Sequence, residues 1–573
     1  MHFIIMLKTP NKEKIGIILT SLVCLAAFFA NNEVITPDIM ESRNIVTARE
    51  MVYDGHWIIP TMNGELRLEK TPLPTWLTAV AEAVSPDNLA LQRGMAGLAA
   101  LLLVVYFWKF ARRILRLKPL IPTLLLCTCY NVILMGRTAT WDIYCHAFMM
   151  GGIYHLAQAF RASPPAAWRH FIAAGIFTGL SIMSKGPVSL YALFLPFLIS
   201  YGFTFRPTLK GKVTAIVTMT VIAIVIGTWW YAYVHWAEAE TLTAVVQKES
   251  GSWLNRNVRP WWYYWKFFLE TGIWSLLLLT AMFLPLADKQ RRKSHRWLFS
   301  IGWMLASLVL LSLLPEKKSR YLLPLLIPAG YVMGCLMAWW KESLNDRHSA
   351  PLSDKWLFRL NAGLVTVAVA ALPAAAWWFL LRPGYVSVGY WVVFSLFVAA
   401  LTVCLLRAVA ELRPMGLLGG VVLLFFVAEC FILPTLGNII NNPDMKSIAA
   451  TRDIKVLQDV PFCHIDTVPL RIELVYAAHR KIRPISPDSL RSALPCALLT
   501  HRPIACELPA DCLKGIEAIA IDCYDDNHRP KTNRRYSTDF IYHVTLLKAK
   551  EAADESKKEN NHTIKDDEQD KEL

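Results

Sequence analysis

Several common sequence motifs are missing from this chain of 573 residues, and each absence argues against a class of protein. It has no Gly-x-x-x-x-Gly-Lys-Ser/Thr loop and no glycine-rich dinucleotide fingerprint with acidic ribose-binding spacing, which argues against an enzyme driven by ATP or by a nucleotide sugar. It has no His-Glu-x-x-His motif. None of its five cysteines after residue 460 forms a Cys-x-x-Cys pair, so a zinc ribbon is not expected.

Charged residues are also scarce, at 18% of the chain, whereas hydrophobic residues make up 55%. A soluble domain usually has about 25% charged residues. The charges gather between apolar runs of about 18 residues, the length that crosses a bilayer as a helix. The sequence therefore predicts an α-helical polytopic membrane protein with about thirteen transmembrane helices. These cover residues 15–30, 91–110, 120–135, 143–160, 171–183, 188–205, 213–235, 267–286, 297–314, 321–340, 360–381, 386–406 and 415–433.

Lysine and arginine concentrate in every second loop, which accounts for the net charge of +15. Examples are Arg112 with Arg113, Arg206 with Lys210, and the run 289–296. Basic loops of membrane proteins face the cytoplasm, so this pattern orients the helices without any nucleic acid as a partner. It predicts a cytoplasmic N-terminus and an extracytoplasmic C-terminal segment.

Composition divides the chain into three parts. Residues 1–436 form the transmembrane domain, with a first external loop over residues 31–90 that contains amphipathic interfacial helices. Residues 437–547 have an ordinary composition, which predicts a small soluble α/β domain outside the cytoplasm, where disulfides are allowed. Residues 548–573 are rich in Lys, Glu, Asp and Asn, and such a segment cannot bury enough surface to fold.

The loops opposite the basic ones hold the residues that can carry chemistry. Charges that converge at one membrane face are costly unless they have a function. In the first external loop, Asp38 and Glu41 follow shortly after a span and precede a helical pattern over residues 41–53. A carboxylate there can act as a general base, and the structural alternative is that Asp38 caps the helix.

An ordered set of motifs in these loops resembles the GT-C membrane glycosyltransferases. The branch in question contains the aminoarabinose (lipid A) transferases and is related to the protein O-mannosyltransferases, of the glycosyltransferase family 39 type. The motifs spread in order over the first 330 residues. They comprise Glu41, Arg43, Arg49-Glu50-Met51, the turn from Trp57 to Gly64, Glu69-Lys70 through Trp76, Arg137 with Asp142, Lys185-Gly186-Pro187, Arg259-Pro260-Trp261-Trp262-Tyr263-Tyr264, and Lys317 with Tyr321 and Pro324.

The match departs from the family pattern at the first carboxylate. The family has adjacent Asp and Glu, whereas here Ile39 and Met40 separate Asp38 from Glu41. Either Asp38 keeps the catalytic role, which the preceding Pro37 favours, or Met40 replaces it and Glu41 or Asp142 acts instead. Thr71, where the family has proline, is a second departure.

The resemblance implies an inverting enzyme that moves a sugar from a polyprenyl-phosphate carrier to lipid A, a glycolipid or a protein. It implies a multi-pass protein of the bacterial inner membrane, with Asp38, Glu41 and Asp142 as candidate catalytic residues. Cations must stabilise the lipid phosphate as it leaves. Candidates for that contact are Lys70, Tyr321, Arg259, Lys185 and Lys317, and further substrate-site candidates are Arg43, Glu69, Arg137, Arg256, Trp262 and Tyr263.

Other interpretations fit the same residues. Each lysine could simply reach toward the membrane interface, and Trp261 to Tyr264 could form an ordinary aromatic belt or line the groove for the polyprenyl chain. No cofactor is required, although a divalent metal is possible through Glu69 with His235 or His56. A protein O-glycosyltransferase is an alternative, and a transporter or flippase of lipid-linked saccharides is a rival from another class.

Overall fold

The structure is a computed structural model that describes residues 11–440, 442, 444–531, 533–534 and 536–550. The chain forms two compact units that divide between Ile440 and Asn441, and each is described by itself. The segment predicted to be disordered, 548–573, lies outside the described residues from 551 onward.

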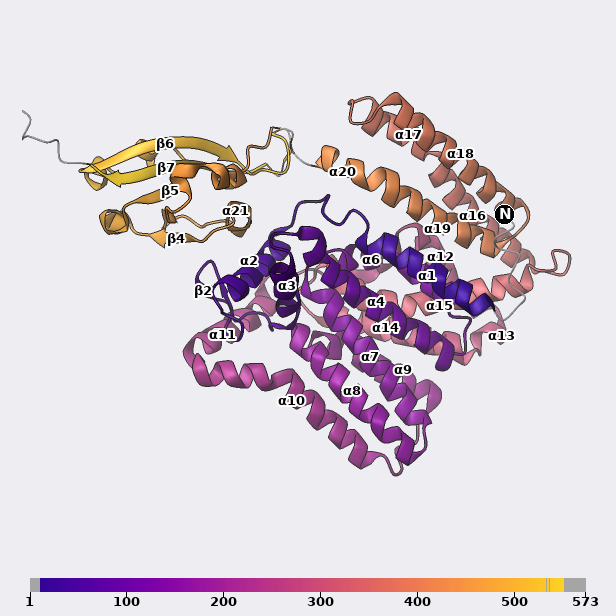
Figure 1. The fold of residues 1–573 in the computed structure, drawn as a ribbon. Coiled ribbons are helices and arrows are strands. Elements are labelled where there is room, and N and C mark those ends of the chain that lie inside the picture. The colour runs from indigo at the N-terminus through magenta and orange to yellow at the C-terminus, as the bar shows by residue number, and fades with distance from the viewer. Residues whose placement is uncertain (1–10, 441, 443, 532, 535, 551–573) are drawn as a thin grey trace, which may run out of the picture. The chain divides into compact units, whose positions relative to one another are not determined.

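The first unit is helical (Figure 1). Its elements are α1 (Asn11–Phe29), α2 (Ile39–Tyr53), β1 (Thr61–Met62), β2 (Glu65–Leu66), α3 (Leu73–Val84), α4 (Leu89–Arg113), α5 (Leu120–Cys127), α6 (Tyr130–Gly136), α7 (Trp141–Arg161), α8 (Pro164–Lys185), η2 (Leu190–Phe194), α9 (Leu195–Phe205), α10 (Val213–Ala237), α11 (Ala239–Asn255), η3 (Trp261–Trp274), α12 (Ser275–Ala287), α13 (Lys289–Arg292), α14 (His295–Leu313), η4 (Ser319–Leu322), α15 (Leu323–Ser343), α16 (Leu352–Ala370), α17 (Leu372–Ala376), η5 (Trp377–Leu381), α18 (Val388–Ala410), α19 (Pro414–Val427), η6 (Ala428–Ile432) and α20 (Leu433–Ile440).

The helices agree with a multi-pass membrane protein, and each predicted span falls on one helix or on two or three successive helices. Among the described residues, eight helical segments are long and apolar enough to cross a membrane, and two shorter apolar helices are Lys14–Phe29 and Leu190–Phe205. The predicted span 120–135 is broken into α5 and α6. The total of thirteen spans stays a prediction, because several of the helices are short or carry polar residues.

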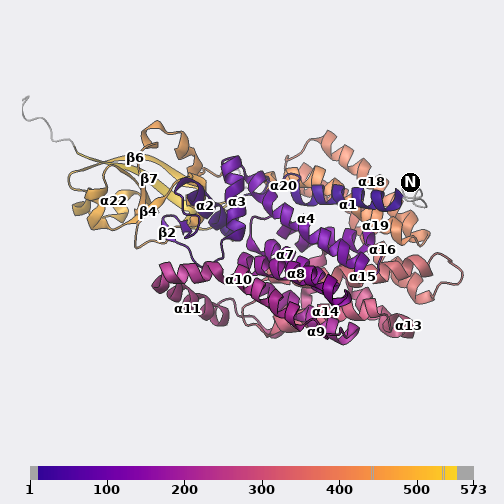
Figure 2. The same cartoon turned by 60° about the horizontal axis from the view of Figure 1, so that its bottom comes forward.

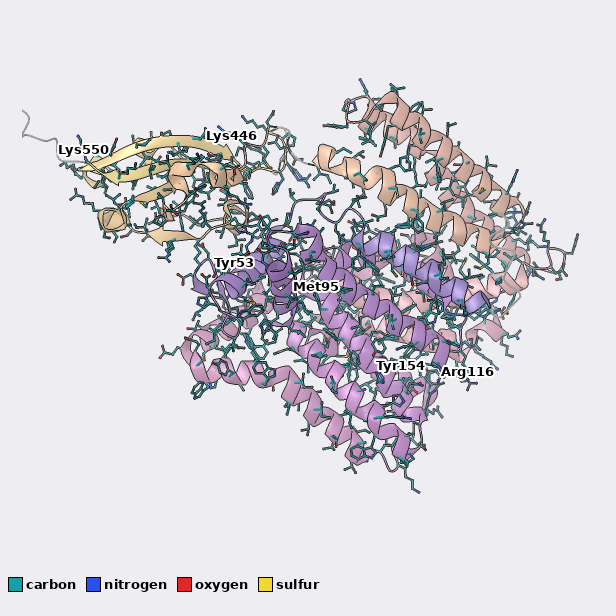
Figure 3. The ribbon with its side chains drawn as sticks, viewed as in Figure 1. Tyr53, Met95, Arg116, Tyr154, Lys446 and Lys550 are labelled. Atoms are coloured by element: carbon teal, nitrogen blue, oxygen red, sulfur yellow. The ribbon has the colours of Figure 1, made fainter. Side chains whose placement is uncertain are left out.

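Small residues let neighbouring helices of this unit approach closely. Helices α7, α8 and α10 lie side by side (Figures 1 and 2), and glycines occupy the face between α8 and α10. A Cβ atom on Gly179 would lie 2.6 Å from Cβ of Ile226, and one on Gly227 would lie 2.8 Å from Cβ of Ile182. Close packing of this kind is typical of membrane helices, which gain little from hydrophobic burial against each other. Large side chains such as Tyr154 on α7 fill the interior of the unit (Figure 3).

The first external loop is more enclosed than the sequence predicts. Its pattern predicts a helix with one apolar face on the membrane, but α2 is buried along most of its length, from Glu41 to Met51. The reason is that its polar residues have partners inside the protein. Asn44, for example, donates to Thr78 at 3.0 Å and to the carbonyl of Ala139 at 2.9 Å.

The second unit contains a five-stranded mixed sheet in its described residues, in the order β4-β3-β5-β7-β6. Strand β3 runs parallel to β4 and β5, whereas β7 is antiparallel to β5 and β6. Its five cysteines are free thiols. The elements are η7 (Ile448–Asp453), η8 (Lys455–Leu457), β3 (Phe462–Ile465), α21 (Ile472–Ala478), β4 (Ile482–Ile485), η9 (Pro487–Ala493), β5 (Cys496–Thr500), α22 (Ile504–Glu507), η10 (Ala510–Leu513), β6 (Ile516–Asp525), η11 (Thr538–Phe540) and β7 (Ile541–Ala549).

The packing of α8 on α10 gives a test of the fold. Gly179→Ala places a methyl group against Ile226 and 3.1 Å from the carbonyl oxygen of Ala223, so we expect overpacking to cost about 1–3 kcal/mol of stability. Thermal unfolding in detergent measures the effect. The matched control is Gly202→Ala on α9, where a Cβ atom meets nothing within 4 Å and stability should not fall. Equal melting temperatures for the two variants would contradict this packing.

Candidate functional site

A buried ion pair lies at the centre of the candidate site. Asp142 is in the first turn of α7, where the free N–H groups of the helix favour a negative charge, and it is only 2% exposed. Its Oδ1 pairs with Nζ of Lys185, the last residue of α8. The ends of α7 and α8 thus bring together two residues that the sequence motifs place in different loops.

Tyr321 stands beside this pair and has three cations around its ring. Nζ of Lys185 lies 5.0 Å from the ring centroid, Nζ of Lys318 lies 5.6 Å away, and Cζ of Arg320 lies 5.8 Å away. Arg320 interacts electrostatically with Asp142 and with Asp38. Its Nε is buried and has no hydrogen-bond partner in the part of the chain that the structure describes. In this cationic cluster, defined as Lys185, Lys318, Arg320 and Tyr321, Nε of Arg320 is the donor left for an anion among the described residues, because Lys185 pairs with Asp142 and Lys318 pairs with Glu316 at 2.5 Å.

Lys70 adds a further cation from the first external loop. Its Nζ lies 3.1 Å from Oε2 of Glu249 on α11, which is 179 residues away in the chain. Burial lowers the pKa of Lys70 from its usual value, and the neighbouring Glu249 partly opposes that shift. Lys70 and Lys185 also interact electrostatically, so the two cations share one region.

Asp38 and Glu41 have different environments although they are three residues apart. Asp38 is exposed and caps α2, and its Oδ1 accepts the backbone N–H groups of Met40 and Glu41, each at 2.9 Å. Both capping bonds use the same oxygen. Glu41 is buried, and its two oxygens accept Nε and Nη2 of Arg93 at 2.8 Å each. It also accepts the N–H of Ala139 at 2.9 Å, so its acceptors are occupied by the protein itself.

Several other predicted site residues also have structural partners. Arg137 pairs with Glu429 of η6 at 2.8 Å and donates to the carbonyl of Ala27 at 2.9 Å, which fixes the end of α6 against α1. Nζ of Lys317 is buried and donates to the carbonyl of Leu314. Both cations therefore bind groups of the protein itself.

The remaining charged residues of the prediction form no ion pair with the described residues. Arg43 lies on α2 and its Nε is buried with no hydrogen-bond partner among the described residues. Glu69 interacts electrostatically with Arg67. On the segment before and within η3, Arg256, Arg259 and Trp262 are exposed, and the hydroxyl of Tyr263 lies 3.5 Å from that of Ser319.

A wide apolar groove opens next to these residues. It has a volume of about 950 Å³ and lies between η3, α12 and α14. One end begins at Trp261 and Trp265 of η3, close to Arg259, and Arg292 is its charged lining residue at α13. The rest of the lining is almost wholly hydrocarbon, including Phe267, Phe268, Met282, Phe283, Leu286, Leu298, Leu305 and Val309. A groove of this kind suits a long lipid chain.

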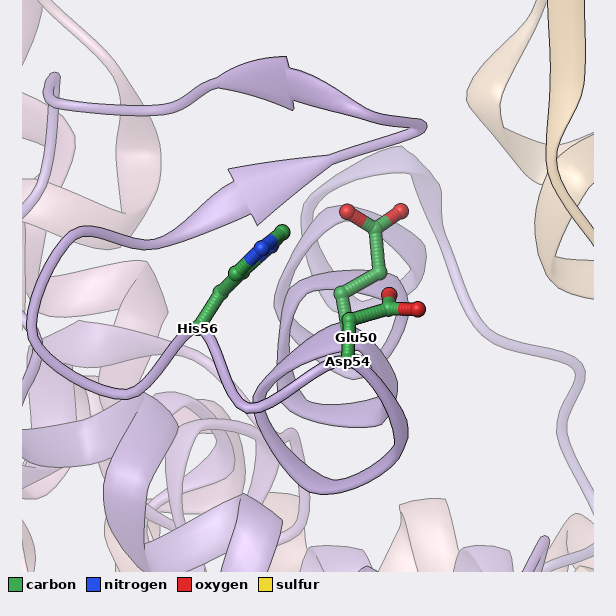
Figure 4. Close-up of side chains that lie close together, drawn as sticks. All are labelled: Glu50, Asp54 and His56. Carbon is green, nitrogen blue, oxygen red and sulfur yellow. The ribbon is translucent and has the colours of Figure 1, made fainter.

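One group of residues in the described structure could hold a metal ion. Glu50, Asp54 and His56 have potential ligand atoms within 4.8 Å of one another (Figure 4). The structure thus places His56 beside Glu50 and Asp54, whereas the sequence suggests Glu69 as its partner. Glu50 already accepts the hydroxyl of Thr61 and the backbone N–H of Asn63, each at 2.5 Å. We therefore assign Glu50 to holding the β1–β2 turn.

The sequence analysis missed three residues of this region. Glu249 lies on a helix with no motif, so nothing in the sequence connects it to Lys70. Arg93 is hidden at the start of a predicted apolar span, where it could be mistaken for an interfacial cation. Arg320 could have been predicted from the sequence, because it directly precedes the motif residue Tyr321. In the structure it is the basic residue of the last turn of η4.

The fold matches a solved structure along nearly its whole length. The crystal structure of ArnT from Cupriavidus metallidurans bound to undecaprenyl phosphate superposes with a TM-score of 0.62 over 94% of this chain and 98% of that one, at 17% sequence identity. The same enzyme in the apo state gives a TM-score of 0.60. This chain therefore has the fold of the GT-C membrane glycosyltransferases, and the resemblance seen in its motifs is confirmed.

Within that class, the sequence is similar to aminoarabinose transferases. It is 26% identical over 345 residues to undecaprenyl phosphate-α-4-amino-4-deoxy-L-arabinose arabinosyl transferase 1 of Pseudomonas fluorescens Pf0-1, covering 58% of each chain. It is 25% identical over 343 residues to transferase 2 of Proteus mirabilis HI4320, covering 56% of this chain and 59% of that one. The match thus spans less than two thirds of either relative. Residues 69–231 match the family described as dolichyl-phosphate-mannose-protein mannosyltransferase.

The pair of Glu41 and Arg93 gives a test of its structural role. Removal of either partner leaves a buried charge unpaired, so we expect Glu41→Gln and Arg93→Met each to cost about 3–5 kcal/mol of stability. The double variant should lose less than the sum of the two, which thermal unfolding in detergent measures as a coupling energy. The control is Asp511→Asn, in an exposed pair with Lys514, which should leave stability unchanged. Additive losses from Glu41→Gln and Arg93→Met would disprove the coupling.

Proposed function

We propose that this protein transfers a sugar from a polyprenyl-phosphate carrier to an acceptor lipid resembling lipid A, at the outer face of the bacterial inner membrane. The observation that carries the proposal is the combination of the cationic cluster, the carboxylates Asp38 and Asp142, and the apolar groove in one region. The printed names of the relatives, and of the solved structure with undecaprenyl phosphate, support the same class of donor.

The cationic cluster binds the donor phosphate in this proposal. The phosphate becomes more negative as its bond to the sugar breaks, and fixed cations stabilise that charge in the transition state. Arg320 is well suited because its Nε is buried without a partner, and a guanidinium can hold a phosphate through two N–H groups. Lys185 and Lys70 contribute charge, the hydroxyl of Tyr321 donates a hydrogen bond, and Arg259 reaches the phosphate from the mouth of the groove. The polyprenyl chain lies in the apolar groove.

Asp38 is the general base in this proposal. Its Oδ1 accepts both capping bonds, so Oδ2 is available to accept the proton of an acceptor hydroxyl. That hydroxyl oxygen attacks the anomeric carbon as the bond between the carbon and the phosphate oxygen breaks. The single displacement inverts the anomeric centre and releases polyprenyl phosphate. Asp142 is the second candidate, but its pairing with Lys185 suits it better to positioning that lysine.

The topology follows from the basic loops. The N-terminus lies in the cytoplasm, and the second unit lies in the periplasm, where it can contact the acceptor. A protein hydroxyl is the alternative acceptor, which the match of residues 69–231 to protein mannosyltransferases supports. No metal is needed for this chemistry, because the cations of the chain supply the charge.

A transfer assay tests the reaction and its base. Membranes with wild-type protein should move label from a radiolabelled polyprenyl-phosphate sugar to a lipid acceptor, and Asp38→Asn should lower kcat about 10²- to 10⁴-fold because the proton acceptor is lost. The control is Asp346→Asn in an exposed loop at the other membrane face, which should keep full activity. Full activity of Asp38→Asn with a dead Asp142→Asn would move the base to Asp142. Label that crosses the membrane with no transfer would favour a flippase.

The lowered pKa of Lys70 predicts a pH dependence. Its ammonium binds phosphate only while protonated, and because its pKa lies below the usual value, KM for the donor should begin to rise at a lower pH than an ordinary lysine allows. Lys70→Arg should shift this rise to higher pH, because guanidinium holds its proton more strongly. Glu249→Gln should shift it to lower pH, since Glu249 favours the ammonium. If KM has the same pH profile in all three proteins, Lys70 does not bind the donor.

A further inference from the structure

Glu270 is a carboxylate that the proposed reaction does not use. It lies on η3, within the candidate membrane span Trp261–Ala287, and it is half-buried. Its Oε2 accepts a hydrogen bond from Nδ2 of Asn131 at 3.1 Å. Glu270 has no ion pair within 4.0 Å in the described ranges of the chain.

Glu270 is an ionisable residue within a candidate membrane span, and the segment does not provide it with a close cation. Ionisable residues within membrane spans are costly, and they generally face a cavity or a partner rather than lipid. The nearest cation along the segment is Lys266, but its Nζ is placed over the ring of Tyr263, 4.5 Å from the centroid. Lys266 and Glu270 interact electrostatically without forming a salt bridge. A cation that is not part of the protein would satisfy Glu270.

Asn131, which contacts Glu270, also has a buried polar atom without a partner among the described residues. It lies on α6, is only 2% exposed, and donates through Nδ2 to Glu270 and to the carbonyl of Ser319 at 3.3 Å. Its Oδ1 is buried and has no hydrogen-bond partner in the described structure. A buried acceptor of this kind is rare in native proteins and costly to leave unpaired. Oδ1 of Asn131 is an acceptor only, and so are both oxygens of Glu270 in its ionised form, so the complement of this pair is a group that only donates.

The position of this pair links it to the donor. Ser319 is the first residue of η4, and only Arg320 separates it from Tyr321 of the cationic cluster. The carbonyl of Ser319 is therefore within one helical turn of the groups proposed to bind the donor phosphate. The sugar is bonded directly to that phosphate, so it lies in the same small region as Glu270 and Asn131.

We propose that Glu270 and Asn131 form a subsite that binds an ammonium group carried by the sugar of the donor. An ammonium has three donors, no acceptor and a positive charge, which matches an unpaired carboxylate and an unpaired amide oxygen. A sugar with a hydroxyl in that place leaves the carboxylate without its counter-ion, so the subsite selects for the amino sugar. This assignment rests on the proposed function.

The test compares two donors on one enzyme. Wild-type protein in membranes is assayed with polyprenyl-phosphate 4-amino-4-deoxy-arabinose and with polyprenyl-phosphate arabinose, which has a hydroxyl in place of the amine. We expect Glu270→Gln to raise KM for the amino sugar about 10- to 100-fold, as for a lost hydrogen bond to a charged group, with KM for the neutral sugar changed less than about twofold. Asn131→Ala should show the same preference with a smaller change. The matched control is Glu342→Gln at the exposed C-terminal end of α15, which should change neither value.

The outcomes separate the two proposals. If Glu270→Gln raises both KM values equally, or if only KM for the acceptor changes, the ammonium subsite is wrong although transfer stands. If the wild type prefers the neutral sugar, the subsite is also wrong. If the wild type transfers neither sugar while control membranes with a known transferase do, the proposed function itself fails. Thermal unfolding of Glu270→Gln guards against a folding defect, and a loss of the amino-sugar preference at an unchanged melting temperature supports the subsite.

Discussion

The site depends on the bidentate ion pair between Arg93 and Glu41. Arg93 holds Glu41 with two N–H groups and donates with a third to the carbonyls of Asn32 and Ile35, at 2.5 and 2.7 Å. Glu41 in turn accepts the N–H of Ala139, between α6 and α7. One buried pair thus fixes the start of α2, the loop before it that contains Asn32 and Ile35, and the loop that leads to Asp142. Because each charge has several hydrogen bonds, the pair overcomes the large penalty for burying charge, and the positions of Asp38 and Asp142 follow from it.

Much of the fold could be predicted from the sequence because it depends on local signals. Apolar runs and the residues that interrupt them predict the helices, and the ordered loop motifs predict the GT-C fold. The sequence did not predict that α2 is enclosed, since that depends on partners such as Thr78 and Ala139 from other segments. Likewise the partner of Lys70 could not be foreseen, because Glu249 comes from a helix 179 residues away. Periodicity shows which face of a helix is apolar, but it does not show which helix will cover that face.

The candidate site shows the same difference between local and long-range contacts. The motifs point to a set of cations and carboxylates in these loops, and in the structure Lys185, Asp142 and Tyr321 lie together. They could not separate residues that face a cavity from those that hold the protein together. The sequence makes Arg137 a candidate substrate-site residue and Lys317 a candidate phosphate ligand, yet Arg137 pairs with Glu429 and Lys317 donates to a backbone carbonyl. That distinction needs side-chain contacts.

The pair of Lys70 and Glu249 has a consequence for the resting protein. A lysine exposed alone in a basic region would attract any small anion from the surrounding solution, whereas a lysine that already has a carboxylate partner is electrically balanced. In the proposed reaction, the phosphate that binds Lys70 competes with Glu249, and a lipid-linked phosphate offsets this competition with further contacts through its hydrocarbon chain. Inorganic phosphate has no such chain, so the proposed function gives this pair a part in selecting lipid-linked phosphate over free phosphate.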